Sequence, residues 1–532
     1  MALGEAAAPV ARHLTWLLAA LAAATYVLAM APLRTAWFTD DDWHFLALLR
    51  HVDAATDAFS EHFMGSYGYR PVAMVLFAMT ALVFGADALP QYLLNVALHA
   101  AVALLLWRLA IAFAAPNRVA MILAAAFLLG PVTQATPLWI SNRFDLLATA
   151  LCLLALLCTH RWLQGVSGGL ADAVGAVLAM LFALGSKETA LAMVPPLLLL
   201  LIAYPAPNRR CSARIVLASL LLGIAAMYWL ARSHALGAAA PSWSIAELVA
   251  GIRQWCWAGV SLLTHPAIFV GAALVAASFP LFWADSKRMI EAQRGARPPG
   301  ADPQLVIRGA LLTLVAGIVV LQGPVAAMAL GITTDTAGGG EADLPLVSRR
   351  FYYFVMAGVL LLPATFRWPV AQPWGSPGRL ALLLASAGLG IWAFAARQQS
   401  EYWAQATNNA LHAYQLLQPE VGERLTAAAA QSQQHAAPTA CVVDLTGTAG
   451  PDHRAMPTYG LPLDLIVKAH LPKGDARVDC VLITQPPQAM ALTRVYPCSA
   501  TAFPGWRSVH PAMAPLARSG TCTFFAQVVA QP

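Results

Sequence analysis

The chain has 532 residues, of which 59% are hydrophobic and 11% charged, and its formal net charge is +6. Soluble domains carry about 25% charged residues, so this composition, with a mean hydropathy of +0.63, excludes an ordinary soluble protein and indicates a polytopic membrane protein. The basic excess does not indicate nucleic-acid binding, because no basic run is interleaved with aromatic residues and most arginines lie in short loops between apolar segments.

The first apolar segment, residues 14–32, is followed by a run of carboxylates. The segment is long enough to cross the ~30 Å hydrocarbon core of a bilayer, and we expect it to be retained as a transmembrane helix. Asp40, Asp41 and Asp42 come next, with His44 close behind. Like charges this crowded raise the pKa of at least one carboxyl unless a cation lies among them. The run suits a general base or a divalent-metal site, and a solvated loop start is the alternative interpretation.

Ten further segments are apolar enough to span a membrane: 90–113, 118–136, 145–161, 171–186, 189–204, 214–233, 266–283, 306–325, 351–366 and 380–396. Loop arginines and lysines favour the cytoplasm. All basic loops lie in the cytoplasm only if segment 71–86 does not span the membrane. It must instead lie at the membrane–water interface, within one long outer loop of residues 33–89. We therefore expect an α-helical polytopic protein of the plasma (inner) membrane, with eleven spans, a cytoplasmic N-terminus and an extracytoplasmic tail.

The tail differs in composition from the apolar part, so we expect a membrane module at 1–397 and a small α+β domain at 398–532. In the tail, residues 398–434 are predicted to be helical, and strands are predicted at 440–445, 477–485 and 521–529. Four of the eight cysteines lie here: Cys441, Cys480, Cys498 and Cys522. An oxidising compartment would allow two disulfides, and the sequence leaves their connectivity open.

With this topology, polar residues collect on the outer face of the membrane module. In chain order they are Tyr69 with Arg70, Asn95 with His99, Arg143 with Asp145, Lys187 with Glu188, and Arg349 and Arg350 with Tyr352. Each group also has a structural interpretation, as helix-end charges, interhelical hydrogen bonds or contacts to lipid headgroups. A charge within a bundle costs roughly 2.5–3.5 kcal/mol on insertion scales, so convergence of these groups on one face favours a functional site.

The order of these motifs resembles the GT-C superfamily of membrane glycosyltransferases. The run from Asp41 to Phe45 is similar to the signature that opens the first outer loop of protein O-mannosyltransferases. The wider series resembles the tetratricopeptide-containing transmembrane O-mannosyltransferases, although the tail lacks their repeats. In relatives such as oligosaccharyltransferases, a second acidic residue follows the first at a distance that Asp145 matches here.

This resemblance implies transfer of a sugar, mannose in the nearest relatives, from a polyprenyl-phosphate carrier to a hydroxyl of a protein, glycan or lipid acceptor. Asp41 is then expected to be the general base, with Asp42 and Asp145 completing the catalytic set. Arg70, Arg349, Arg350 and Lys187 are expected to bind the donor phosphate. The supporting residues are Asp40, His44, Tyr69, Asn95, His99, Arg143, Glu188 and Tyr352. If a metal is bound, Asp41, Asp42 and Asp145 suit Mg²⁺ or Mn²⁺ better than zinc.

Two other classes of function remain open from the sequence. One is a transporter or flippase of lipid-linked sugars, whose site would lie near the middle of the membrane rather than at one face. The other is a non-enzymatic membrane scaffold that displays the tail.

Overall fold

The computed structural model describes the helical part of the chain and four strands of the tail. The described residues are 17–38, 42, 69–85, 87–165, 169–206, 209–236, 245–262, 265–284, 302–329, 352–366, 368, 376–435, 439–444, 478–483, 493–497 and 523–528.

The chain divides into two compact units. The first comprises Met1–Pro32, Ala58–Leu76 and Pro90–Glu401, and the second comprises Leu33–Asp57, Phe77–Leu89 and Tyr402–Pro532. The first unit holds most of the apolar helices and the second holds the strands. The expected domain boundary near residue 397 stays a prediction.

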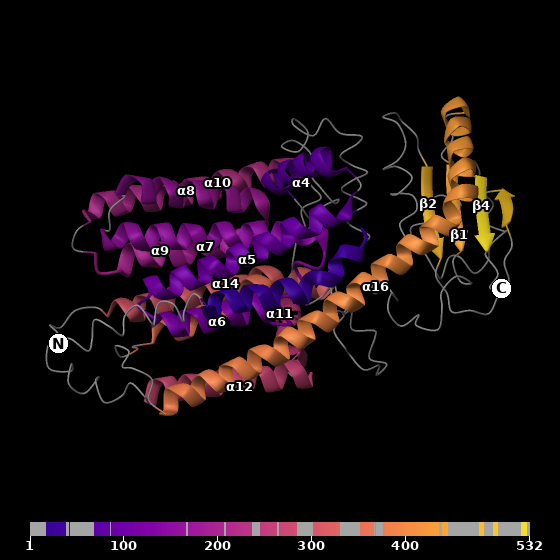
Figure 1. Ribbon diagram of the computed structural model, residues 1–532. Coiled ribbons are helices and arrows are strands. Elements are labelled where there is room, and N and C mark those ends of the chain that lie inside the picture. The colour runs from indigo at the N-terminus through magenta and orange to yellow at the C-terminus, as the bar shows by residue number, and fades with distance from the viewer. Residues whose placement is uncertain are drawn as a thin grey trace, which may run out of the picture. The chain divides into compact units, whose positions relative to one another are not determined.

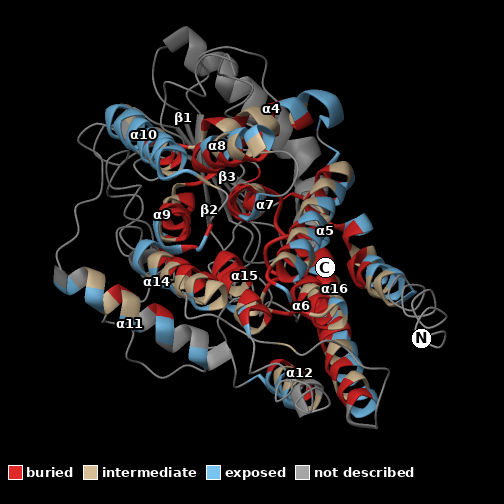
Figure 2. Ribbon diagram, turned by 90° about the vertical axis from the view of Figure 1, so that its left-hand side faces the viewer, coloured by how far each residue is buried: buried red, intermediate tan, exposed pale blue. Residues whose placement is uncertain are grey.

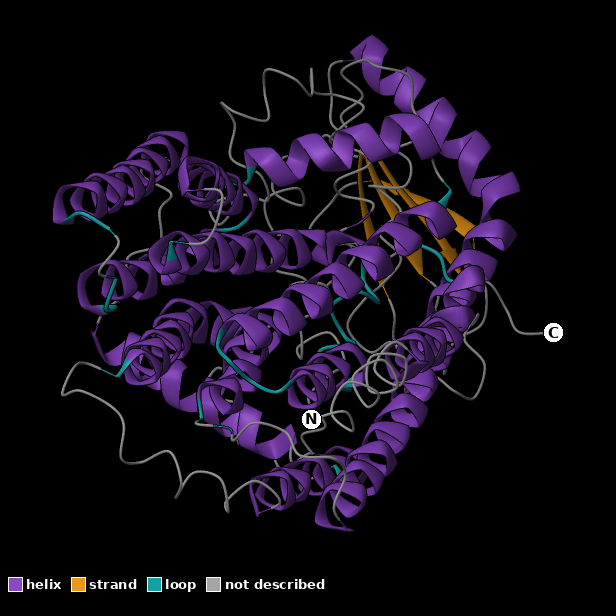
Figure 3. Ribbon diagram, turned by 60° about the vertical axis from the view of Figure 1, so that its left-hand side comes forward, coloured by secondary structure: helices purple, strands orange, loops and turns teal. Residues whose placement is uncertain are grey.

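Among the described residues, seven helices are long and apolar enough to cross a membrane. They are the helix within Leu17–Thr35, which ends in η1 (Ala31–Thr35), and α5 (Ala88–Ala112), α7 (Arg143–Gln164), α8 (Gly169–Ser186), α10 (Cys211–Leu236), α14 (Pro303–Ala329) and α16 (Ser376–His435). All seven coincide with predicted spans. The prediction of an α-helical polytopic membrane protein is confirmed (Figure 3).

The other four predicted spans correspond to shorter apolar elements. These are α6 (Asn117–Leu129), η4 (Glu188–Met193) with α9 (Val194–Ala203), α12 (Pro266–Ala284), and α15 (Tyr353–Leu361) with η7 (Leu362–Thr365). The segment expected in the interface forms α4 (Pro71–Phe84), which is shorter than the roughly 20 residues that a span needs. A further helix, α11 (Ile245–Leu262), packs along α14 and was not predicted.

Helix α7 forms the centre of the helical bundle. It packs against α8, α9 and α15, and 67% of its apolar stretch is buried, compared with 17% for α10. Figure 2 shows this contrast as a mostly red α7 and a mostly pale blue α10, and Figure 1 shows α7, α8 and α9 lying alongside one another. The start of α7 is thereby enclosed by other elements, and this is where the candidate site lies.

The described arginines of the basic loops lie beside helix ends of the bundle. Arg209 Nε donates to the carbonyl oxygen of Trp162, at the end of α7, over 2.6 Å. Arg308 Nη2 donates to the carbonyl oxygen of Thr365 over 3.2 Å. In both cases the guanidinium donates to a carbonyl in the last turn of a helical element, and the Trp162 carbonyl also accepts the backbone N–H of Gly165. Because α7 is 22 residues long, its start lies about 33 Å away, at the opposite end.

The described part of the tail contains the end of α16 and a four-stranded sheet. The strands are β1 (Thr439–Asp444), β2 (Val478–Ile483), β3 (Thr493–Pro497) and β4 (Thr523–Val528), in the order β2-β1-β4-β3. Strand β1 is parallel to β2 and β4, whereas β3 is antiparallel to β4. Three of these strands were predicted, and β3 was missed.

Helix α16 joins two segments that were predicted separately, the span 380–396 and the helix 398–434. It continues because no glycine or proline lies between Gly390 and Pro419. Within the first unit it packs on α12, where Trp392 Nε1 donates to the carbonyl oxygen of Ile268 over 3.4 Å.

Candidate functional site

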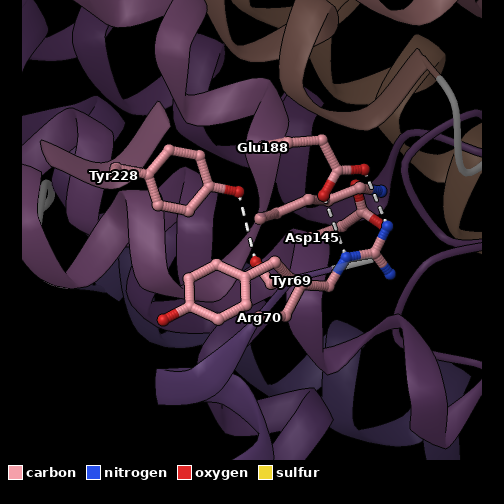
Figure 4. Close-up of polar contacts among 6 residues, drawn as sticks. Tyr69, Arg70, Asp145, Glu188 and Tyr228 are labelled. Carbon is pink, nitrogen blue, oxygen red and sulfur yellow. Dashed lines mark hydrogen bonds and ion pairs between the residues drawn. The ribbon is translucent and has the colours of Figure 1, made fainter. Parts of the chain in front are cut away.

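Four charged side chains from three distant segments meet at the start of α7. The Arg70 guanidinium forms a bidentate pair with Glu188, with distances of 3.0 Å from Nε to Oε2 and 2.7 Å from Nη2 to Oε1. Lys187 Nζ lies 2.5 Å from Asp145 Oδ1. Figure 4 shows Arg70 and Glu188 facing each other with Asp145 beside them. We call these four residues the charge cluster.

Local backbone structure presents the acidic and basic groups of the cluster. Asp145 lies in the first turn of α7, where the helix dipole favours a negative charge. Lys187 is extended, with φ −161° and ψ 140°, and interrupts the helical path between α8 and η4. This break turns Lys187 and Glu188 out of the helix, so that each reaches a partner from a different segment.

Arg70 is held in place from two sides. Its guanidinium lies over the Phe144 ring, 5.2 Å from the ring centroid, which is a cation–π contact. The hydroxyl of Tyr228, on α10, donates to the carbonyl oxygen of Tyr69 over 3.2 Å (Figure 4). Tyr228 thereby fixes the backbone immediately before Arg70.

The charge cluster is largely shielded from solvent. Side-chain exposure is 14% for Arg70 and 21% for Glu188, and it is 9% for Lys187 and 5% for Asp145. Removing an ion from water costs several kcal/mol even after relaxation, and pairing offsets this cost only when the geometry is good. Two cations and two anions therefore compensate one another in the cluster.

The pKa values of the two adjacent residues reflect this pairing. Burial alone would raise the pKa of Glu188, but Arg70 and Lys187 hold it at about 2. Burial lowers the pKa of Lys187, and the negative charge of Asp145 opposes that shift. The two neighbouring cations therefore favour the ionised form of Glu188.

A network of buried hydrogen bonds connects the start of α7 to α5. Asn95 Nδ2 donates to the carbonyl oxygen of Trp139 over 2.9 Å, and Asn95 Oδ1 accepts from Arg143 Nε over 3.1 Å. Arg143 Nη2 donates to Gln91 Oε1 over 2.8 Å. The network ties α5 to η3 (Ile140–Asn142) and to α7, next to Asp145. It brings together Asn95 and Arg143, both expected as supporting residues.

His99 and Tyr352 occupy different surroundings. His99 Nδ1 lies 2.7 Å from the hydroxyl of Tyr353, deep in the bundle. The neighbouring Tyr352 instead stacks on Trp255, with ring centroids 4.6 Å apart, and donates its hydroxyl to the Trp255 carbonyl oxygen over 2.6 Å. The structure therefore connects Tyr353, rather than Tyr352, to the expected residue His99.

Three residues that hydrogen-bond to expected site residues were missed by sequence reasoning: Gln91, Tyr228 and Tyr353. Gln91 lies four residues before Asn95, which is one helical turn, and this spacing on one helix face could have indicated it. Tyr228 lies in an apolar run with nothing in the sequence to distinguish it.

The remaining expected site residues cannot be placed in the cluster. Asp40, Asp41, His44, Arg349 and Arg350 lie outside the described residues. Asp42 is described, is fully buried and belongs to the second unit. Their catalytic and phosphate-binding roles stay predictions.

The described residues do not fit a metal ion at Asp145. The Lys187 ammonium already lies against this carboxylate, where a divalent cation would bind. Across the described ranges, no group of three His, Cys, Asp or Glu side chains is placed to hold a metal. The expectation of Mg²⁺ or Mn²⁺ now rests on Asp41 and Asp42 alone.

Neither a protein-family model nor a curated protein matches the sequence. Two solved structures are similar to this chain at 14% sequence identity. The crystal structure of the Archaeoglobus fulgidus oligosaccharyltransferase in the apo form gives a TM-score of 0.46, covering 89% of this chain and 64% of that one. Archaeal oligosaccharyltransferase AglB from Archaeoglobus fulgidus, in complex with an inhibitory peptide and a dolichol-phosphate, gives a TM-score of 0.38, covering 73% and 56%. The chain spans less than two thirds of the length of either match.

Proposed function

We propose that this protein is a membrane glycosyltransferase of the GT-C type, which moves a sugar from a polyprenyl-phosphate carrier to a hydroxyl acceptor. The observation that carries the proposal is the charge cluster. Four ionised groups are held against their desolvation cost at one end of a membrane bundle, and ionisable residues placed in this way usually serve function.

The cluster can recognise a lipid-linked phosphate. Arg70 pairs with Glu188 through Nε and Nη2, and the contacts described for its guanidinium leave Nη1 available as a donor. A fixed guanidinium stabilises the negative charge that builds on a departing phosphate. Lys187 supplies a second positive charge nearby. The polyprenyl chain would remain in the bilayer while the phosphate meets the protein at the membrane surface.

The sugar transfer itself needs a base, which the sequence resemblance assigns to Asp41. In this mechanism the acceptor oxygen attacks the anomeric carbon and Asp41 takes its proton. The bond from the anomeric carbon to the phosphate oxygen breaks, the lipid phosphate leaves as an anion, and the configuration is inverted. A positioned carboxylate typically contributes about 10²–10⁴-fold to such a reaction.

The position of the cluster favours a transferase over a transporter. It lies at the end of α7 away from the basic loops, whereas transporter sites usually lie near the middle of the membrane. We infer that this end is extracytoplasmic, because basic loops favour the cytoplasm. The donor sugar, with mannose as the nearest resemblance, and the protein, glycan or lipid acceptor belong to this proposal.

The proposal is tested by reconstituting the purified protein in liposomes with a panel of polyprenyl-phosphate sugars. We expect one donor to be consumed by the native protein, and consumption to fall by at least ~100-fold in Asp41→Asn, because a general base is lost. If the native protein consumes none of the donors, the transferase function is contradicted. Equal consumption by Asp41→Asn would instead overturn the role of that residue.

A further inference from the structure

The end of α7 that lies away from the charge cluster is strongly basic. Two connecting segments, 159–175 and 201–214, carry four arginines and one acidic residue, Asp172, which leaves three positive charges. The arginines are Arg161, Arg209, Arg210 and Arg214. The bond from Arg209 to the Trp162 carbonyl oxygen holds the two segments together, and α8 packs against both α7 and α10. The single acid is already paired, because Asp172 Oδ1 lies 3.4 Å from Arg161 Nε.

Arg209 presents its two terminal nitrogens to the start of α8. Its Nε is held by the Trp162 carbonyl, and its guanidinium lies over the Trp162 ring, 5.0 Å from the ring centroid. A Cβ added at Gly169, the first residue of α8, would lie 3.3 Å from both Nη1 and Nη2. The first backbone N–H groups of a helix lack helical acceptors, and the helix dipole favours an anion there. Guanidinium and backbone donors for a phosphate therefore lie side by side.

The other three arginines differ in how far their charge is already used. Arg214 donates from Nε and Nη2 to three carbonyl oxygens at the end of α9, so it stabilises that helix end. Arg161 and Arg210 are exposed. We call Arg161, Arg209 and Arg210 the arginine patch.

Exposed apolar side chains beside the arginine patch fit the acyl chains of a lipid. Leu170, next to Gly169 on α8, is 80% exposed, and Ile215, on the first turns of α10, is 60% exposed. An anionic phospholipid carries a phosphate above two apolar chains, which matches this arrangement of charge over apolar surface. A free phosphate ion or an acidic protein segment would leave the apolar side chains uncovered.

We propose that the arginine patch binds the phosphate headgroup of an anionic phospholipid, whose acyl chains lie along Leu170 and Ile215. Basic surfaces between transmembrane helices bind anionic headgroups on the cytoplasmic side, where the expected topology places these loops. The site lies at the opposite end of α7 from the charge cluster, so it is separate from the proposed donor site. The inference does not depend on the proposed glycosyltransferase activity.

Lipid titration of the purified full-length protein in a neutral detergent tests the proposal. Native mass spectrometry measures binding of phosphatidylglycerol and of phosphatidylcholine, with inorganic phosphate added as a competitor. We expect phosphatidylglycerol to bind at least ~10-fold more tightly than phosphatidylcholine, because choline cancels the phosphate charge. Inorganic phosphate at the same concentration should displace little of the bound lipid, because it lacks the acyl chains.

Two variants of the arginine patch locate the site. Each arginine near an anionic headgroup strengthens binding by about fivefold, so Arg210→Gln should weaken phosphatidylglycerol binding by about that factor. The double variant Arg209→Gln, Arg210→Gln should weaken it further. Because Arg210 is exposed, Arg210→Gln should keep the native unfolding midpoint, whereas Arg209→Gln also removes a hydrogen bond at the end of α7.

Arg397, on α16, provides the matched control. Its side chain is 42% exposed, close to the 46% of Arg161, and Arg397→Gln should bind phosphatidylglycerol as the native protein does. Native affinity in Arg210→Gln, or an equal loss in Arg397→Gln, would overturn the location of the site. Equal binding of the two lipids would overturn the anionic headgroup, and complete displacement by inorganic phosphate would overturn the lipid. None of these readouts requires turnover of a sugar donor.

Discussion

Asp145 and Lys187 neutralise each other in a place where either charge alone would be costly. Replacing Lys187 by Met should leave Asp145 uncompensated, and breaking one side of a buried ion pair typically costs about 3–5 kcal/mol. We expect a lower midpoint of thermal unfolding for Lys187→Met in detergent. The double variant Asp145→Asn, Lys187→Met should recover most of the loss, because it leaves no unpaired charge. A double variant no more stable than the single one would contradict the pairing.

The ion pair of Glu188 should make the free energy of unfolding of the first unit depend on pH. Its pKa is held at about 2, below its ordinary value of 4.5, so the unfolded chain takes up the proton first as the pH falls. The stabilisation is complete above about pH 5 and is lost progressively towards about pH 2. Thermal unfolding measured across this range should show a weaker pH dependence for Glu188→Gln than for the native protein. Equal pH dependence would argue against the pairing with Arg70.

At the scale of residues, the sequence identified the members of the charge cluster but not their pairing. Arg70, Asp145, Lys187 and Glu188 were all expected on one face, because charges are rare in apolar segments. Their partners could not be predicted, since Arg70 and Glu188 are separated by 118 positions. The bond between Tyr353 and His99 was not predicted either, and the supporting role expected of Tyr352 stays a prediction.

At the scale of elements, α8 packs closely against the start of α4, next to the residues that carry the Arg70–Glu188 pair. A Cβ added at Gly185 would lie 2.5 Å from Val72 Cγ2, and Val72 is two residues after Arg70. Gly185→Ala should therefore push these elements apart. Overpacking of this kind typically costs 1–3 kcal/mol, which should be visible as a lower unfolding midpoint.

Gly223, on α10, provides the matched control for this substitution. A Cβ there would meet nothing within 4 Å. Gly223→Ala should be neutral or stabilising by about 0.5–1 kcal/mol, because alanine favours the helix. If both variants lose the same stability, the close approach at Gly185 is not the cause.

Prediction of elements succeeded where the apolar pattern was long and failed where it was short or continuous. The seven long helices coincide with predicted spans because about 20 apolar residues are needed to cross a bilayer. Strand β3 was missed because it has five residues and ends in Pro497. The continuity of α16 was missed because the change from apolar to polar composition at residue 397 was interpreted as a boundary.

At the scale of the whole molecule, the orientation of the bundle can be tested with two native cysteines. Both are exposed. Cys211 begins α10, close to the basic loops, whereas Cys256 lies on α11, which follows α10 and precedes α12 in the chain. In single-cysteine variants, an impermeant maleimide should label Cys256 on intact cells and Cys211 only after permeabilisation. The reverse pattern would place the charge cluster on the cytoplasmic side.

The most direct test of the account compares two buried aspartates at opposite ends of the bundle. Asp145 belongs to the charge cluster, and Asp172 pairs with Arg161 over 3.4 Å at the basic end. With the donor that the native protein consumes, Asp145→Asn should lower turnover by at least ~100-fold, because Lys187 loses the partner that holds it beside the proposed phosphate site, while Asp172→Asn should stay within a few-fold of native. Equal turnover by the two variants, whether both active or both inactive, would contradict the claim that the site lies at the start of α7.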